Sequence, residues 1–164
     1  MTAPVDLRSD TVTLPSARMR QAMTRARVGD SQRGEDPSVR ALEEHAASLF
    51  GKEAALFVPS GTMGNLVSVA SWTRPGDIVV ASASSHIAGR EGPGISQLAA
   101  VAVVGIESPD GIFTADDVAG AIASAPLRSR GSVRLVTAEN TLLEEGTAGH
   151  DSGGVPRASP VRCP

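Results

Sequence analysis

The sequence predicts an α/β fold in which a mostly parallel sheet is flanked by helices. Two observations support this class. Short apolar runs bounded by glycine, proline or polar turn residues alternate with longer segments whose apolar residues recur at helical spacing. The short runs are continuously apolar rather than alternating, which is typical of parallel strands buried on both faces. Right-handed crossovers between such strands would place the helices on the faces of the sheet.

The boundaries of the elements follow from local start and stop signals. Asp36 before Pro37 is the strongest helix start, because Asp is a favoured N-cap and Pro suits the first helical position; that helix should end at Gly51. Thr114 with Asp117 resembles a capping box that opens a later helix. Helices are expected from Pro15 to Gly29, Pro37 to Gly51, Met63 to Trp72 and Thr114 through Ile122, and strands at Ala54–Val58, Ile78–Ala81, Ala99–Val104 and Val133–Val136.

Composition excludes several classes of function. The 164 residues suit one domain, and a net charge of -3 with a pI near 5.6 argues against a nucleic-acid partner. The single cysteine, Cys163, allows no internal disulfide, and the three histidines are scattered, so no metal site is expected. With neither a leader pattern nor an apolar run of membrane-spanning length, the sequence predicts a cytoplasmic protein without membrane contact.

The turn Ser60-Gly61-Thr62 is the first candidate for chemistry. It lies between a predicted strand and a predicted helix, where free amides and the helix dipole favour an anion such as a phosphate. The alternative is that the three residues only make a tight turn and cap the helix. Neither the P-loop pattern nor the dinucleotide-binding glycine pattern occurs, so nucleotide binding loses its main support.

His86 is the second candidate. It follows the strand Ile78–Ala81 and should therefore lie at the carboxyl end of the sheet, where open α/β sheets bind ligands. An imidazole there could stack on a planar cofactor or move protons near neutral pH. The alternative is a loop histidine bonded to backbone. His45 is expected on the surface of its helix, and His150 in an unstructured tail.

Six segments in order resemble one family, the threonine aldolases and aromatic amino acid β-eliminating lyases. The most distinctive is the opening DLRSDTVT, and the resemblance covers roughly residues 5 to 147. The segments are Asp6–Thr13, Gly34–Pro37, Phe50–Ala55, Pro59–Asn65, Ser85–Ile87 and Glu139–Thr141.

The resemblance implies part of an aspartate aminotransferase-like large domain and a lyase of amino acid metabolism. Its reaction would be retro-aldol cleavage of a β-hydroxy-α-amino acid to glycine and an aldehyde, with pyridoxal 5'-phosphate as electron sink. By the same resemblance, Ser9 would help to bind the substrate carboxylate, and His86 would stack on the pyridine ring and assist proton transfer. Because relatives build their active sites between subunits, a homo-oligomer is expected if the chain folds. The residues that would hold the cofactor phosphate are Ser60, Gly61, Thr62 and the Met63 backbone.

The sequence departs from the family pattern at several points. Arg33 stands where the family usually has Tyr, and Leu142 where it usually has a second active-site His. The aspartate that pairs with the pyridine nitrogen and the lysine that forms the Schiff base have no counterpart in the sequence. The single lysine, Lys52, precedes the strand expected at Ala54–Val58, hence at its amino end and away from the crevice.

These departures lead to the expectation of a truncated lyase that is inactive alone. Residues 1–147 would be the N-terminal part of the cofactor-binding domain, and residues 148–164 a disordered tail, whose composition suggests a frameshifted end. A second interpretation is a non-catalytic module that binds a phosphorylated metabolite or pairs with a full-length relative. A third is a fragment that does not fold stably, because an open sheet edge promotes aggregation.

Overall fold

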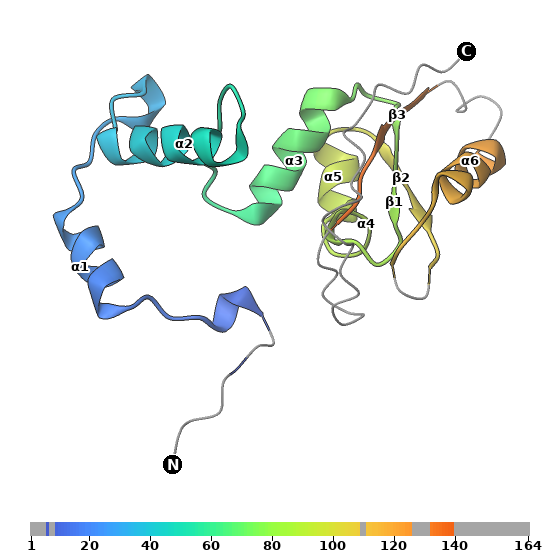
Figure 1. The fold of residues 1–164 in the computed structure, drawn as a ribbon. Helices are drawn as coiled ribbons and strands as arrows, with labels where there is room; N and C mark the ends of the chain where they lie inside the picture. The colour runs from blue at the N-terminus through green and yellow to red at the C-terminus, as the bar shows by residue number, and fades with distance from the viewer. Residues whose placement is uncertain (1–5, 7–8, 109–110, 126–131, 140–164) are drawn as a thin grey trace. The chain divides into compact units, whose positions relative to one another are not determined.

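The computed structural model describes residues 6, 9–108, 111–125 and 132–139 (Figure 1). The chain divides into two compact units, Met1–Pro59 and Ser60–Pro164. The first unit contains only helices among its described residues. Its 3-10 helices are η1 (Asp10–Val12) and η2 (Ser31–Arg33), and its α-helices are α1 (Ala17–Arg25) and α2 (Pro37–Phe50).

Both α-helices of the first unit begin where their caps predict. The hydroxyl of Ser16 accepts a hydrogen bond from the Met19 amide, and α1 then ends at Arg25 rather than continuing to Gly29. The Asp36 carboxylate caps α2, and Gly51 ends it in the left-handed conformation with φ 60°. Glycine suits that C-terminal position because the conformation penalises a Cβ atom. The predicted helix from Pro37 to Gly51 is therefore confirmed.

The prediction of a strand at Ala54–Val58 is wrong. The segment is neither helix nor strand, and its Leu56 side chain is 70% exposed. The Phe57 amide donates to the Glu43 side chain at 2.8 Å rather than to a neighbouring strand. A short apolar run signals a capacity for burial, but a strand also needs a partner with matching backbone groups. The described residues of this unit provide none.

The second unit is a three-layer α/β structure. Its sheet has three parallel strands in the order β2-β1-β3. Helices α3, α4 and α5 lie on one face and α6 on the other (Figure 1). The predicted α/β class, with a parallel sheet flanked by helices, is confirmed. The strands are β1 (Ile78–Ser82), β2 (Ala102–Ile106) and β3 (Val133–Val136), and the helices are α3 (Gly61–Trp72), α4 (His86–Gly89), α5 (Gly92–Leu98) and α6 (Ala115–Ser124).

Alternate residues of β1 face two separate clusters of buried side chains. Val79 and Ala81 pack with Val69 of α3 and with residues of α4 and α5. On the opposite face, Ile78 and Val80 pack with Ile106 and Ala125. All five residues of the strand are buried. Burial on both faces explains why the four residues before Ser82 are all apolar. The core of the unit thus lies on both sides of its central strand.

The segment between the first two strands differs from the prediction. The expected loop contains α4 and α5, and β2 begins at Ala102 because Ala100 takes a left-handed conformation with φ 54°. Pro93 lies in the first turn of α5, where a missing amide hydrogen is tolerated. The Thr114–Asp117 capping box is confirmed, with both reciprocal hydrogen bonds. The turn expected at Asp110-Gly111 lies partly outside the described residues, although Gly111 has φ 69°.

Candidate functional site

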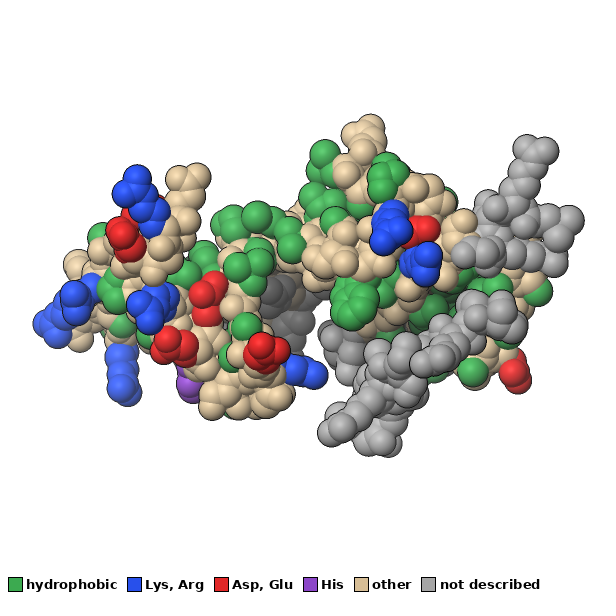
Figure 2. Space-filling model, turned by 90° about the horizontal axis from the view of Figure 1, so that it is seen from above, with side chains coloured by type: hydrophobic (Ala, Val, Ile, Leu, Met, Phe, Trp, Pro, Cys, Tyr) green, Lys and Arg blue, Asp and Glu red, His purple; other side chains and the backbone are tan. Residues whose placement is uncertain are grey.

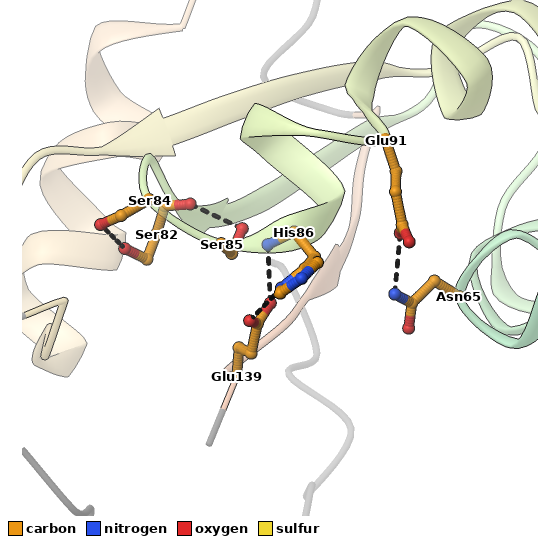
Figure 3. A network of polar contacts seen from close by, with 7 residues as sticks. All are labelled: Asn65, Ser82, Ser84, Ser85, His86, Glu91 and Glu139. Atoms are coloured by element: carbon orange, nitrogen blue, oxygen red, sulfur yellow. Dashed lines mark hydrogen bonds and ion pairs between the residues drawn. The ribbon is translucent and has the colours of Figure 1, made fainter. Parts of the chain in front are cut away.

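The turn after β1 fixes the start of α4 at the carboxyl end of the sheet. The Ser85 amide and hydroxyl both donate to the Ser82 carbonyl, at 3.1 and 2.7 Å. The hydroxyls of Ser82 and Ser84 lie 3.3 Å apart (Figure 3). Ser82 and Ser85 are buried, so the turn is packed as well as hydrogen-bonded. His86, the first residue of α4, therefore lies at the carboxyl edge, as the sequence predicts.

Glu139 contacts His86 through both of its carboxylate oxygens. Glu139 Oε2 accepts from the His86 backbone amide at 2.7 Å, and Oε1 lies 2.6 Å from His86 Nδ1 (Figure 3). Both side chains are partly buried, with 32% of His86 and 23% of Glu139 exposed. Glu139 follows β3, the strand hydrogen-bonded to β1. Sequence reasoning missed this contact; the signal for it was that both residues follow strands of one parallel sheet, whose carboxyl ends meet.

The Ser60-Gly61-Thr62 turn opens α3 as predicted, although no strand precedes it. The Ser60 hydroxyl accepts from the Met63 amide at 3.1 Å, which leaves its own proton available to a ligand. Gly61 and Thr62 are the first residues of the helix, where backbone amides have no acceptor within the helix. The space beside the Gly61 Cα atom is open, since an added Cβ would meet nothing within 4 Å. All three residues are exposed.

The N-terminal part of α3 is hydrogen-bonded to the segment that follows His86. Asn65 Nδ2 donates to Glu91 Oε2 at 2.8 Å, and Glu91 is the residue before α5 (Figure 3). Figure 1 shows that α3 runs antiparallel to the strands, so its N-terminus lies at the same end of the sheet as their carboxyl ends. The helix N-terminus and the histidine thus occupy one end of the second unit.

A pocket of about 280 Å³ lies beside this edge. Its walls are α3, the start of α4 and the segment that begins in β3 and ends at Glu139. Neither the Ser60–Met63 turn nor His86 lines it. The lining residues are Asn65, Ser68, Val69, Trp72, Ser85, Ile87, Leu135, Thr137, Ala138 and Glu139.

The remaining predicted residues belong to the first unit or lie outside the described residues. The Ser9 hydroxyl accepts from the Thr11 amide and hydroxyl, at 3.3 and 3.0 Å. Its role toward a substrate stays a prediction, because the other site residues belong to the second unit. His45 is exposed on α2, as expected. Lys52 is exposed after α2; its expected position at the amino end of a strand is wrong, since that strand does not form.

The next residue is Arg33, at the position where the family pattern usually has a tyrosine. Arg33, which stands there, lies 3.6 Å from an Asp30 carboxylate oxygen, Nε to Oδ2, and both side chains are largely exposed. Leu142, His150 and Cys163 lie outside the described residues, as does the tail expected at 148–164. Within the described part of the chain, no group of three or more His, Cys, Asp or Glu could hold a metal ion, and no helix could span a membrane.

Comparisons with known proteins point to one family. The sequence profile described as beta-eliminating lyase matches residues 6–149. The chain is 44% identical to low-specificity L-threonine aldolase 1 of Arabidopsis thaliana, over 87% of this chain and 40% of that protein. It is 40% identical to low specificity L-threonine aldolase of Escherichia coli K12, over 84% of this chain and 41% of the relative. It therefore spans less than half the length of these relatives.

A solved structure agrees on the fold. The structure of threonine aldolase from Leishmania major superposes with a TM-score of 0.60 and 24% identity, over 76% of this chain and 36% of that one. At this identity the likeness shows the fold, which is the aspartate aminotransferase-like fold expected from the sequence.

Proposed function

Because the chain belongs to the beta-eliminating lyase family, we propose that it forms the part of a pyridoxal-phosphate-dependent lyase that holds the cofactor phosphate and ring. The whole enzyme would cleave a β-hydroxy-α-amino acid to glycine and an aldehyde, as a threonine aldolase does. One observation carries the proposal: an open helix N-terminus and a histidine anchored by a carboxylate occupy the same end of the sheet.

The donors at the start of α3 fit a phosphate. The first-turn amides of Gly61 and Thr62 and the hydroxyls of Ser60 and Thr62 all offer protons, and the dipole of the helix adds positive potential. The open space beside the Gly61 Cα atom would let a phosphate oxygen approach the backbone. The Met63 amide already donates to Ser60, so its part would be to orient that hydroxyl.

His86 supplies a ring with one nitrogen already engaged. Because Glu139 holds Nδ1, the Nε2 atom and the ring face are the parts of His86 that can meet a ligand. We assign His86 stacking against the cofactor ring and transfer of a proton at Nε2, and Ser9 binding of the substrate carboxylate. The cofactor, when bound, supplies the electron sink for carbon–carbon cleavage.

Phosphate recognition is tested by a Thr62→Ala variant with Ser71→Ala as its matched control. Ser71 lies near the other end of α3 and donates to the Val67 carbonyl, so its loss leaves the helix N-terminus intact. We expect Thr62→Ala to weaken binding of pyridoxal phosphate about 10- to 150-fold, since a hydrogen bond to a charged group contributes about 1.5 to 3 kcal/mol. Fluorescence titration with pyridoxal phosphate, and with pyridoxal lacking the phosphate, measures this. Equal affinities of the two variants would contradict the assignment.

We further propose that these 164 residues alone do not turn over amino acids. The support is that the only lysine, Lys52, is exposed after α2 and lies outside the second unit. Borohydride reduction with equimolar pyridoxal phosphate, followed by peptide mapping, should show no stoichiometric labelling of Lys52. Stoichiometric labelling that disappears in Lys52→Ala, together with aldehyde release from threonine, would overturn this part of the proposal.

The second candidate is a non-catalytic module for a phosphorylated metabolite, or one that pairs with a full-length relative. The start of α3 favours it equally, because the same donors fit any phosphate monoester. Competition separates the candidates: inorganic phosphate and glycerol phosphate should displace pyridoxal phosphate only weakly if the ring also contacts His86. Equal affinity for all three would favour the module. A cytoplasmic location and self-association stay proposals, the latter open to size-exclusion measurement with light scattering.

A further inference from the structure

The first turn of α4 is capped by Glu139, in the segment that follows β3, rather than by its own N-cap residue. Ser85 occupies the N-cap position, yet its side chain makes no capping hydrogen bond and instead donates to the Ser82 carbonyl. The His86 amide, which a helix leaves without an internal acceptor, donates to Glu139 Oε2. Glu139 lies 53 positions further along the chain. One oxygen of its carboxylate is thus fixed by backbone, which aims the other at the His86 ring.

The proton between Glu139 and His86 can be assigned from the donors and acceptors present. An ionised carboxylate only accepts hydrogen bonds, and Oε1 lies 2.6 Å from Nδ1. The proton of a neutral imidazole must therefore reside on Nδ1, which leaves Nε2 as a bare acceptor. If the ring gains a second proton, that proton binds Nε2 while Nδ1 keeps its own.

We propose that Glu139 is a positioning residue that fixes the His86 ring and its tautomer, so that protons enter and leave at Nε2. The place of this residue in a reaction rests on the proposed function, but the tautomer is a property of the chain without ligand. The backbone contact keeps the carboxylate from rotating away from Nδ1.

The experiment substitutes Glu139→Gln and observes the ring nitrogens of His86. In the variant, the amide oxygen must accept from the His86 backbone N–H, because that group can only donate. The amide nitrogen then faces Nδ1 and donates to it, which forces the imidazole proton onto Nε2. Long-range ¹H–¹⁵N correlation spectra of the histidine-labelled chain, above the pH at which the ring is protonated, distinguish the proton-bearing nitrogen from the bare one. A His86→Asn spectrum identifies the signals.

We expect the protonated nitrogen to be Nδ1 in the unaltered chain and Nε2 in Glu139→Gln. Glu139→Asp, which keeps a carboxylate, should retain the Nδ1 proton. His45, on the exposed surface of α2, is an internal reference whose ring signals should not change. An unaltered chain with the proton on Nε2, or a Glu139→Gln ring still protonated on Nδ1, would overturn the proposal. The first outcome needs no variant, so it is decisive even if Glu139→Gln fails to fold.

The role of Glu139 and the proposed function can fail independently of each other. If the predicted tautomer is found and pyridoxal phosphate does not bind, the proposed function fails while the role of Glu139 in orienting His86 stands. If the cofactor binds and the tautomer is Nε2–H, the role of Glu139 fails while cofactor binding stands.

Discussion

The second unit buries the whole of its central strand, whereas the first unit buries almost no apolar side chain. Every residue of β1 is buried. Among the described residues of the first unit, only Ala47 and Asp36 are buried, and Phe50 at the end of α2 is 73% exposed. Figure 2 shows hydrophobic side chains at the surface among charged ones. Caps thus define where a helix begins and ends, whereas a packed sheet depends on burial from both sides.

The first unit depends instead on one polar cluster around Asp36. Its carboxylate accepts from the Ser38 and Val39 amides at the start of α2, and from the Gly29 amide across the preceding loop. The second unit has a smaller counterpart in the capping box of α6.

The largest expected effect is on the buried strand. Val79 is fully buried, and Val79→Ala should lower the free energy of unfolding of the second unit by about 2 to 3 kcal/mol through lost burial and a residual cavity. Leu98→Ala, in α5 of the same unit, is the control: its side chain is 73% exposed, so a change within about 0.5 kcal/mol is expected. Urea unfolding followed by the fluorescence of Trp72, the only tryptophan, measures both. Coincident midpoints would contradict the burial account.

The next effect is on the loop that reaches Asp36. A Cβ atom at Gly29 would clash with the Glu35 carbonyl oxygen, so Gly29→Ala must displace backbone and break the contact with Asp36. We expect a loss of about 1 to 3 kcal/mol, confined to the first unit. Hydrogen exchange at the Ser38 and Val39 amides reads it out. Gly120→Ala in α6, where the added Cβ meets nothing, should be neutral or slightly stabilising; equal losses in both variants would refute the clash.

Acid should weaken both units through their capping carboxylates. Hydrogen bonds from the Val39, Gly29 and Ser38 backbones hold the pKa of Asp36 below the ordinary 3.8. The Thr114 backbone and then its side chain lower the pKa of Asp117 in the same way. A depressed pKa in the folded state means that unfolding takes up protons. The stabilisation is therefore complete above about pH 3.8 and is lost as the pH falls through the folded value.

The acid effect is measured as the thermal transition against pH. Asp36→Asn keeps a capping side chain but removes the charge, so it should flatten the acid slope of the first unit alone, observed by hydrogen exchange at its amides. Asp117→Asn should flatten the acid slope of the second unit alone. Unchanged acid slopes in both variants would show that other groups govern acid stability.

The smallest effect concerns backbone strain before β2. Ala100 is exposed and takes φ 54°, while its carbonyl accepts from the Gly76 amide at 2.7 Å. Ala100→Gly should stabilise the second unit by about 0.5 to 1 kcal/mol, because glycine adopts this conformation without strain. Ala119→Gly, in the exposed interior of α6, should change stability in the opposite direction by a similar amount. If Ala100→Gly and Ala119→Gly both lowered the free energy of unfolding, strain at Ala100 would be excluded.

Sequence patterns predicted what is decided locally. The Asp36 and Gly51 caps, the Thr114–Asp117 capping box and the strands around Ile78 and Val133 are specified by a few neighbouring residues, and all formed near the expected positions. The strand at Ala54–Val58 failed because pairing is a non-local property. Helices α4 and α5 were missed because glycine, proline and serine are typical of loops, although helix first turns also tolerate them.

The same division applies to the candidate site. The placement of His86 after β1 and of Ser60–Thr62 at a helix start followed from strand and helix boundaries. The contact of Glu139 with His86 did not, because it depends on which strand lies beside β1. The roles of Ser9 and of the phosphate-binding residues stay predictions, since they concern ligands rather than local backbone.

A single titration shows whether the start of α3 and His86 together hold a phosphorylated planar cofactor. Pyridoxal phosphate is added to the ¹⁵N-labelled chain while the Gly61 and Thr62 amides and the His86 ring are observed. We predict that all three sets of signals shift with one dissociation constant, and that pyridoxal without the phosphate leaves the two amides unmoved. Binding that shifts other residues while Gly61 and Thr62 stay unmoved would contradict the claim.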